Sequence, residues 1–248
     1  MHIDDWKGYQ RINFTVEGRE SFLVCPKEAA PGRPWIWRTE FPGAFDNADM
    51  ALLTAGWHLA YHRVSNRYGC PSSIRDMKAF YDVLVPAFSL QPKMVPFGFS
   101  RGGLYAVNYA LAYPETVAAL YLDAPVLDIR SWPGGKGCGV GAAYEWEQCK
   151  ACYQLQSEEE AEAFAGNPLD NAEKLAFSGI PVMLVAGDAD EVVPYTENGE
   201  PFSDRMEEAG GRISVILKAD CGHHPHSLDD PAPILEFIEI FTGFPCGV

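Results

Sequence analysis

The chain has 248 residues, and its 19 lysines and arginines against 34 aspartates and glutamates give a formal net charge of −15 at pH 7. Its 47 % hydrophobic and 12 % aromatic residues exclude an intrinsically disordered chain. The acidic charge argues against a nucleic-acid partner, because phosphate binding needs a basic face, and it disfavours an anionic membrane surface. We therefore expect one soluble domain with a sizeable core.

Seven cysteines are an odd number in a chain too long to need disulfide stapling, so we expect free thiols. Cys149 and Cys152 form a single C-x-x-C pair without a second pair at zinc spacing, which favours buried thiols over a metal or redox site. The sequence holds no recognisable signal peptide and no apolar stretch of the roughly 20 residues that cross a membrane. We expect a cytoplasmic protein, unless a signal peptide has been removed.

The N-terminal half predicts a β-hairpin and then alternating strands and helices. Segments 10–16 and 20–24 alternate apolar and polar residues around the turn at 17–19, and a short aromatic strand follows at 35–37. Further strands are expected at 57–64, 94–99 and 117–122, and helices at 48–55, 72–85 and 101–113.

The C-terminal half repeats the alternation after an interruption. Continuous apolar strands between helices predict a mostly parallel central sheet flanked by helices, with antiparallel pairing where the hairpin joins it. At about 128–178, after the sixth expected strand, glycine-rich turns and short helical pieces predict a cap-like insertion within a single α/β domain spanning 1–248. The remaining expected strands are 181–186 and 213–217, and the remaining helices are 203–209 and 231–241.

The strongest functional signal is the G-x-S-x-G sequence at 98–102, which is followed by Gly103. It lies between an apolar strand and a helix. A serine on a sharp strand-to-helix turn needs small neighbours, because the backbone packs closely there. Such a turn presents the Ser100 hydroxyl at the carboxyl end of the sheet, near the amides that begin the helix. The pattern therefore predicts Ser100 as a nucleophile.

A serine nucleophile needs a base that is oriented by a third group, commonly a carboxylate. The carboxylate is expected in the loop after the strand at 181–186, where Asp190 is the preferred candidate. Asp188 in the same loop and Asp123 at the end of an earlier strand remain alternatives.

The base is expected in the loop after the last strand, where residues 222–226 read Gly-His-His-Pro-His. His223, directly after the glycine, is predicted to accept the proton of Ser100 and to return it to the leaving group. Asp190 is then expected to hold the other ring nitrogen of His223.

The same histidine cluster has a metal site as its alternative interpretation. Cys221 and His226 are the further side chains that such a site would use, but the spacing matches no metal-ligand pattern. We therefore expect no metal ion and no cofactor, and we expect His224 and His226 in a loop or at the pocket wall.

An oxyanion hole needs two N–H donors aimed at the developing charge. One is expected to be the amide of Arg101, the residue after the nucleophile. The second is expected in the loop after the strand at 35–37, from the amide of Glu40 or Phe41, and the sequence does not choose between them.

Over nearly its whole length the sequence resembles the α/β-hydrolase superfamily, and Ser100, Asp190 and His223 fall at that family's triad positions. It is also similar to a bacterial, serine esterase-like subgroup whose members are mostly labelled only as hydrolases, often near polysaccharide-degrading systems. The resemblance implies the fold and the triad and leaves the substrate open. The shared motifs are FPGAF at 41–45, GFSRGG at 98–103, SWPGGKG at 131–137 and GHHPH at 222–226.

Other residues bear on the substrate. Arg101 follows the nucleophile, as in glucuronoyl esterases, and with Arg38 and Lys136 it is expected to form a small positive island that recognises an acidic acyl compound. An ion pair between Arg101 and a carboxylate is the equally open alternative. Trp132 and His224 are expected to join Arg38 and Lys136 in binding substrate.

We expect a carboxylic ester hydrolase that works through an acyl-enzyme on an acylated or methyl-esterified carbohydrate, as a small molecule or an oligosaccharide. A peptidase or thioesterase on the same scaffold is the first alternative. A catalytically silent binding protein of this fold is the second, and the intact set of Ser100, Asp190 and His223 speaks against it.

Overall fold

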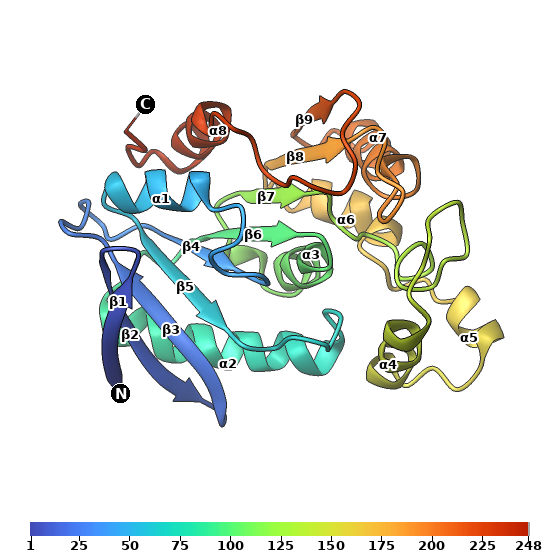
Figure 1. Cartoon of the computed structure of the whole chain (residues 1–248), viewed down its shortest axis with the longest axis horizontal. Helices are drawn as coiled ribbons and strands as arrows, with labels where there is room; N and C mark the ends of the chain where they lie inside the picture. The colour runs from blue at the N-terminus through green and yellow to red at the C-terminus, as the bar shows by residue number, and fades with distance from the viewer. Residues whose placement is uncertain (248) are drawn as a thin grey trace.

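The apolar strands join into one nine-stranded sheet in the computed structural model, which describes residues 1–247 (Figure 1). The strand order is β1-β2-β3-β5-β4-β6-β7-β8-β9. Pairings from β1 to β5 along this order are antiparallel, and all the later ones are parallel. The strands are β1 (His2–Trp6), β2 (Tyr9–Val16), β3 (Arg19–Cys25), β4 (Trp35–Arg38), β5 (His58–His62), β6 (Val95–Phe99), β7 (Leu120–Asp123), β8 (Val182–Gly187) and β9 (Ile213–Lys218).

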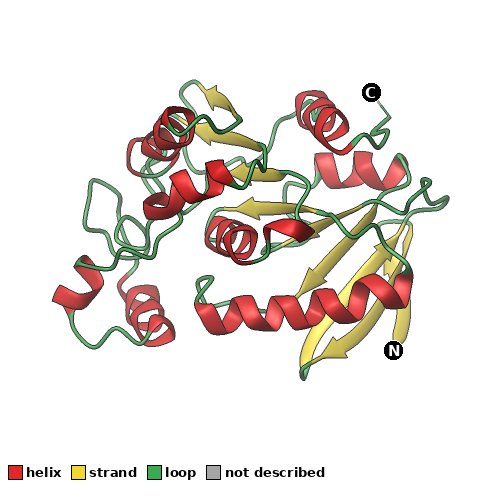
Figure 2. Cartoon of the chain, turned by 180° about the vertical axis from the view of Figure 1, so that it is seen from behind, coloured by secondary structure: helices red, strands yellow, loops and turns green. Residues whose placement is uncertain are grey.

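Helices cover both faces of the sheet. Helices α1 and α8 pack with one hydrophobic cluster, and α2, α3, α6 and α7 pack with another on the opposite face, where Figure 2 shows the long helix α2 in front of the strands. The helices are α1 (Asn47–Thr54), α2 (Pro71–Phe88), α3 (Gly102–Ala112), α4 (Ala143–Tyr153), α5 (Glu158–Glu162), α6 (Ala172–Phe177), α7 (Gly199–Glu208) and α8 (Ala232–Thr242), with 3-10 turns η1 (Pro114–Thr116), η2 (Leu169–Asn171) and η3 (Tyr195–Glu197).

The central strands explain the continuous apolar runs of the sequence. Every residue of β6, β7 and β8 is buried, because helices cover both faces of the sheet at these strands. The mostly parallel α/β fold class predicted from the sequence is confirmed.

Strand β1 is absent from the sequence prediction. Its residues His2–Trp6 are half-buried or exposed, and the strand pairs only with β2 at the edge of the sheet. An exposed edge strand has no buried face and therefore no apolar alternation to reveal it. Because β1 adds one strand at the start of the chain, the insertion that is predicted to follow the sixth strand follows the seventh.

The chain leaves the sheet between β7 and β8, in the segment we call the insertion (residues 128–178). Figure 1 shows α4 and α5 at the right of the molecule, beyond the end of the sheet. Trp146 and Cys149 of α4 pack against Leu104 of α3 in a third hydrophobic cluster. The last helix of the insertion, α6, instead packs in the main core beside α7. The insertion thus packs against the rest of the domain through α4 and α6.

The thiols agree with the expectation from composition. All seven cysteines are free, and burial raises the pKa of Cys149 well above that of an ordinary thiol. No helix among the described residues has the length and apolar character needed to span a membrane.

Candidate active site

Ser100 lies on the turn that joins β6 to α3, with a φ of 51° in the left-handed region. Small neighbours make this turn possible. A Cβ atom on Gly98 would lie 2.9 Å from the Cβ atom of Ala106, and one on Gly102 would lie 2.9 Å from Thr39 Oγ1. The strained turn therefore depends on both glycines, and it holds the serine at the carboxyl end of the sheet.

Three side chains from three separate loops are joined by two hydrogen bonds. Ser100 Oγ lies 3.0 Å from His223 Nε2, and His223 Nδ1 lies 2.7 Å from Asp190 Oδ2. The other oxygen of Asp190 accepts hydrogen bonds from the amides of Val192 and Val193, both at 2.8 Å. These two amides fix the carboxylate, whose side chain is 1 % exposed, so that its remaining oxygen points at the imidazole.

The two alternative acids do not contact this histidine. Asp188 is exposed at the surface. Asp123 is buried and accepts hydrogen bonds from the Tyr121 hydroxyl and the Ser227 amide, both at 2.8 Å. Its second oxygen lies 2.7 Å from Nδ1 of another histidine, His226. A second Asp–His pair therefore stands beside the first.

The amides predicted as oxyanion donors belong to Arg101 and to either Glu40 or Phe41. Among residues 1–247, the amides of Glu40, Phe41 and Arg101 donate to no backbone carbonyl, and a hydrogen bond from the Phe41 amide to the Glu40 carboxylate helps to lower the pKa of that carboxyl. Phe41 lines the same cavity as Ser100, whereas Glu40 is buried and does not line it. Of the two candidates Phe41 therefore lies at the cavity, and its role as the second donor stays a prediction.

The cavity at Ser100 has a volume of about 200 Å³. His224 belongs to its wall and stacks on Phe45, with ring centroids 5.4 Å apart and planes at 13°. Trp132 does not line it; this ring lies 6.2 Å from that of Tyr68, beside the insertion's hydrophobic cluster. The lining residues are Phe41, Ala44, Phe45, Phe99, Ser100, His223, His224 and His226.

The side chain of Arg101 leans over the loop that carries Phe41. Its guanidinium lies 5.1 Å from the Phe41 ring centre, and its Nη2 lies 3.5 Å from Glu40 Oε2. The same oxygen of Glu40 accepts a hydrogen bond from Ser65 Oγ at 3.0 Å. Burial raises the pKa of the Glu40 carboxyl, and the positive charge of Arg101 opposes that rise. The ion-pair alternative for Arg101 is the one found.

Arg38 is not a substrate-binding residue, and that prediction is wrong. Its side chain is 0 % exposed, its Nε lies 2.7 Å from Asp49 Oδ1, and it also donates to the carbonyl of Ala44. The guanidinium lies 3.8 Å from the ring centre of Phe99. Arg38 thus holds the loop after β4 through the Ala44 carbonyl, and the buried carboxylate of Asp49 balances its charge.

Replacing Arg38 by methionine is expected to lower the free energy of unfolding by about 3–5 kcal/mol, because Asp49 would keep a buried, uncompensated charge. The matched control is Arg63→Met, which breaks an exposed pair with Glu20 and is expected to cost less than about 1 kcal/mol. Urea denaturation measures both values. Equal stability of the two variants would contradict the structural role of Arg38.

Lys136 is also engaged away from the serine. Its Nζ lies 2.9 Å from Glu158 and 3.1 Å from Glu162, both in the insertion, and it lines a different cavity. Because Arg38, Arg101 and Lys136 each pair with a carboxylate, the predicted positive island at the site is wrong.

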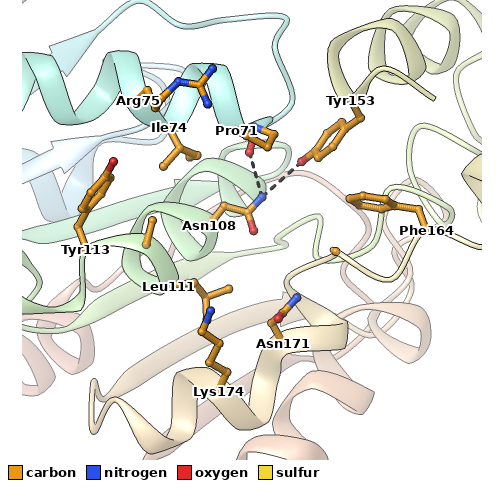
Figure 3. Close-up of a pocket in the computed structure, with 13 residues that line it drawn as sticks. Pro71, Ile74, Arg75, Asn108, Leu111, Tyr113, Tyr153, Phe164, Asn171 and Lys174 are labelled. Carbon is orange, nitrogen blue, oxygen red and sulfur yellow. Dashed lines mark hydrogen bonds between the residues drawn. The ribbon is translucent and has the colours of Figure 1, made fainter.

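A larger cavity, of about 480 Å³, lies elsewhere, between α2, α3 and α6. Figure 3 shows Asn108 of α3 at its centre, with Tyr153 and Phe164 of the insertion to one side. The Asn108 amide donates to the Gly69 carbonyl at 3.0 Å and to the Tyr153 hydroxyl at 3.3 Å. Ser100 does not line this cavity, so its greater volume does not make it the reaction site.

Comparisons with known proteins identify the family and the fold. The prolyl oligopeptidase family matches residues 59–242 of the chain. No curated protein sequence matches it. Three similar solved structures are 14–19 % identical to the chain and therefore show the fold alone, and the predicted bacterial subgroup stays a prediction.

Two solved structures illustrate the likeness. One is a puromycin-hydrolyzing peptidase of Mycobacterium tuberculosis, with a TM-score of 0.68 and 16 % identity over 95 % of this chain and 39 % of that chain. The other is the Pyrococcus horikoshii acylaminoacyl peptidase, with a TM-score of 0.64 and 14 % identity over 87 % of this chain and 38 % of that chain. The chain thus spans less than half the length of either. Since the family match covers most of its residues, the chain belongs to the prolyl oligopeptidase family, a family of serine hydrolases with the α/β-hydrolase fold.

Proposed function

We propose that the chain is a serine peptidase that cleaves the amide bond of short aminoacyl or acylaminoacyl substrates through an acyl-enzyme. The observation that carries the proposal is the pair of hydrogen bonds that joins Ser100, His223 and Asp190 at the wall of a small aromatic cavity. The protein that carries this arrangement belongs to a peptidase family. In this proposal Ser100 is the nucleophile, His223 the general base and acid, and Asp190 the group that orients the imidazole.

Each half of the reaction, acylation and deacylation, proceeds by two proton transfers through His223. As Ser100 Oγ attacks the carbonyl carbon, His223 Nε2 takes its proton, and Asp190 stabilises the imidazolium that forms. The amides of Arg101 and Phe41 receive the negative charge on the carbonyl oxygen. His223 then gives the proton to the leaving amine. Water next attacks the acyl-enzyme by the same two proton transfers, and the acyl group is released.

An amide substrate has better support than a carbohydrate ester. The carbohydrate interpretation used Arg38, Lys136 and Trp132 as substrate-binding residues, and none of the three lines the cavity of Ser100. The family matched by the chain is named for peptidases, and the similar structures are those of a puromycin-hydrolyzing peptidase and an acylaminoacyl peptidase. Ester cleavage by the same groups is expected as a side activity, because esters are the more reactive acyl compounds.

The cavity also sets an expectation for the acyl side of the substrate. Its 200 Å³ lies below the roughly 300–1,000 Å³ of pockets that enclose a drug-sized ligand, so it suits one side chain. Phe41, Phe45 and Phe99 line it, and among residues 1–247 its wall has no lysine or arginine. An apolar side chain therefore fits there, and a carboxylate does not.

A panel of aminoacyl p-nitroanilides tests the proposal. We expect kcat/KM for the phenylalanyl or alanyl compound to exceed that for the aspartyl compound by at least about 100-fold, because burying an unpaired carboxylate costs about 3 kcal/mol or more. Release of p-nitroaniline measures the rates. p-Nitrophenyl acetate and acetylated oligosaccharides serve as ester comparisons, and Ser100→Ala corrects for contaminating hydrolases.

The p-nitroanilide substrates decide between the peptidase and the esterase interpretation, since most serine hydrolases cleave an activated ester. Release of acetate or methanol from oligosaccharides without cleavage of any aminoacyl amide would overturn the peptidase proposal and restore the carbohydrate ester interpretation.

A further inference from the structure

Three histidines converge at the cavity of Ser100. His223, His224 and His226 each offer a ring nitrogen, and these nitrogens all lie within 4.8 Å of one another. The ring centroids are 5.0 Å apart between His223 and His224 and 4.8 Å apart for the other two pairs. The proposed reaction uses only His223, so two imidazoles beside it have no assigned task.

Two of the three rings are oriented as metal ligands usually are. Asp190 lies 2.7 Å from Nδ1 of His223, and Asp123 lies 2.7 Å from Nδ1 of His226. A carboxylate at Nδ1 keeps the proton on that nitrogen and leaves Nε2 with a free lone pair, which is the arrangement around zinc-bound histidine. Both carboxylates are buried and held by further hydrogen bonds, so both rings are fixed in this orientation.

The third ring is free to move toward the other two. His224 is exposed, and among residues 1–247 neither of its ring nitrogens, nor Nε2 of His226, has a hydrogen-bond partner. Zinc holds nitrogen at about 2.0–2.1 Å in a tetrahedron, so the nitrogens need to close to about 3.3 Å. His224, whose ring stacks on Phe45 and makes no hydrogen bond among residues 1–247, is the ring that can rotate during this closure.

We propose that His223, His224 and His226 bind a divalent transition ion, best Zn²⁺, and that this ion inhibits the hydrolase. The ion would take the lone pair of His223 Nε2, the atom that now lies 3.0 Å from Ser100 Oγ. Ser100 then has no base. Three imidazoles leave a fourth position for water or the serine oxygen. The inhibitory consequence rests on the proposed role of His223, whereas metal binding does not.

Direct binding is tested on Ser100→Ala, which keeps all three histidines. Titration with Co²⁺ is expected to give one visible d–d absorption band that saturates at one ion per chain and that Zn²⁺ abolishes. His224→Phe, which keeps an aromatic ring against Phe45, is expected to weaken binding at least 10-fold. His226→Gln gives a second test, and His2→Ala removes an exposed histidine elsewhere as the matched control.

Inhibition is tested on the wild type with an aminoacyl p-nitroanilide, each variant being compared with its own metal-free rate. Zn²⁺ is expected to inhibit reversibly, with recovery on adding a chelator. The half-inhibitory concentration should rise at least 10-fold in His224→Phe and stay unchanged in His2→Ala and Cys221→Ser, the latter testing the nearby thiol.

The outcomes separate the site from the reaction. Absence of a saturable Co²⁺ band, or equal binding by His224→Phe and His2→Ala, would overturn the metal site. Loss of inhibition in Cys221→Ser alone would assign the metal to the thiol and also overturn it. A Co²⁺ band in a protein that cleaves no amide would support the site and overturn the proposed function.

Discussion

Ser100→Ala is expected to lower kcat for an aminoacyl p-nitroanilide by about 10⁴-fold or more while the protein stays folded. The substitution removes the oxygen that lies 3.0 Å from His223 Nε2, and with it the covalent route. Loss of any member of a serine triad typically leaves only the contribution of the oxyanion donors and of substrate binding. Steady-state kinetics and thermal unfolding, measured on the same preparation, check both parts of the expectation.

The matched control is Ser203→Ala, at a buried serine of α7 whose hydroxyl donates to the Glu200 carbonyl. It is expected to keep full kcat. A fluorophosphonate probe should label the wild type and Ser203→Ala, but not Ser100→Ala. If Ser100→Ala kept more than a tenth of the wild-type kcat, another residue would have to be the nucleophile.

The parts of this site that could be predicted from sequence are those fixed by short segments. The turn around Ser100 needs glycine on both sides, and the five consecutive residues 98–102 contain both glycines and the serine. Asp190 and His223 follow the ends of the parallel strands β8 and β9, and such ends meet at one edge of a sheet. Apolar runs revealed those strands, and the candidate triad could therefore be assembled without coordinates.

The partners of charged side chains could not be predicted in the same way. Arg38 and Lys136 looked available because the sequence does not show what surrounds them. The carboxylate that neutralises Arg38 comes from Asp49 in α1, and those that pair with Lys136 come from the insertion. Which cation meets which anion depends on how separate elements pack, and the energy of a pair depends on burial that only the fold determines.

The same limit applies to the second Asp–His pair. Asp123 was a rival for the acid that orients His223, and His226 was assigned to a loop or the pocket wall. Their hydrogen bond joins residues 103 positions apart, from the end of β7 to the loop after β9. The sequence prediction considers Asp123 and His226 separately, whereas in the structure Asp123 is hydrogen-bonded to the imidazole of His226 and not to that of His223.

Asp190→Asn and Asp123→Asn are expected to separate these two pairs. Asp190→Asn should lower kcat by about 10⁴-fold, because an asparagine amide beside His223 Nδ1 donates instead of accepting and favours the tautomer that cannot take the serine proton. Asp123→Asn should lower kcat by at most about tenfold. It should instead reduce the free energy of unfolding by about 1–3 kcal/mol, since the buried carboxylate accepts from Tyr121 and Ser227 and an amide cannot satisfy every donor.

Kinetics and urea denaturation of both variants give four values whose pattern is decisive. A large loss of kcat in Asp123→Asn with a small loss in Asp190→Asn would make Asp123 the orienting acid and would require the loop of His226 to supply the base. The opposite pattern follows from the geometry. The two amides of Val192 and Val193 hold Asp190 so that its free oxygen reaches only His223, while every hydrogen bond of Asp123 goes to groups other than His223.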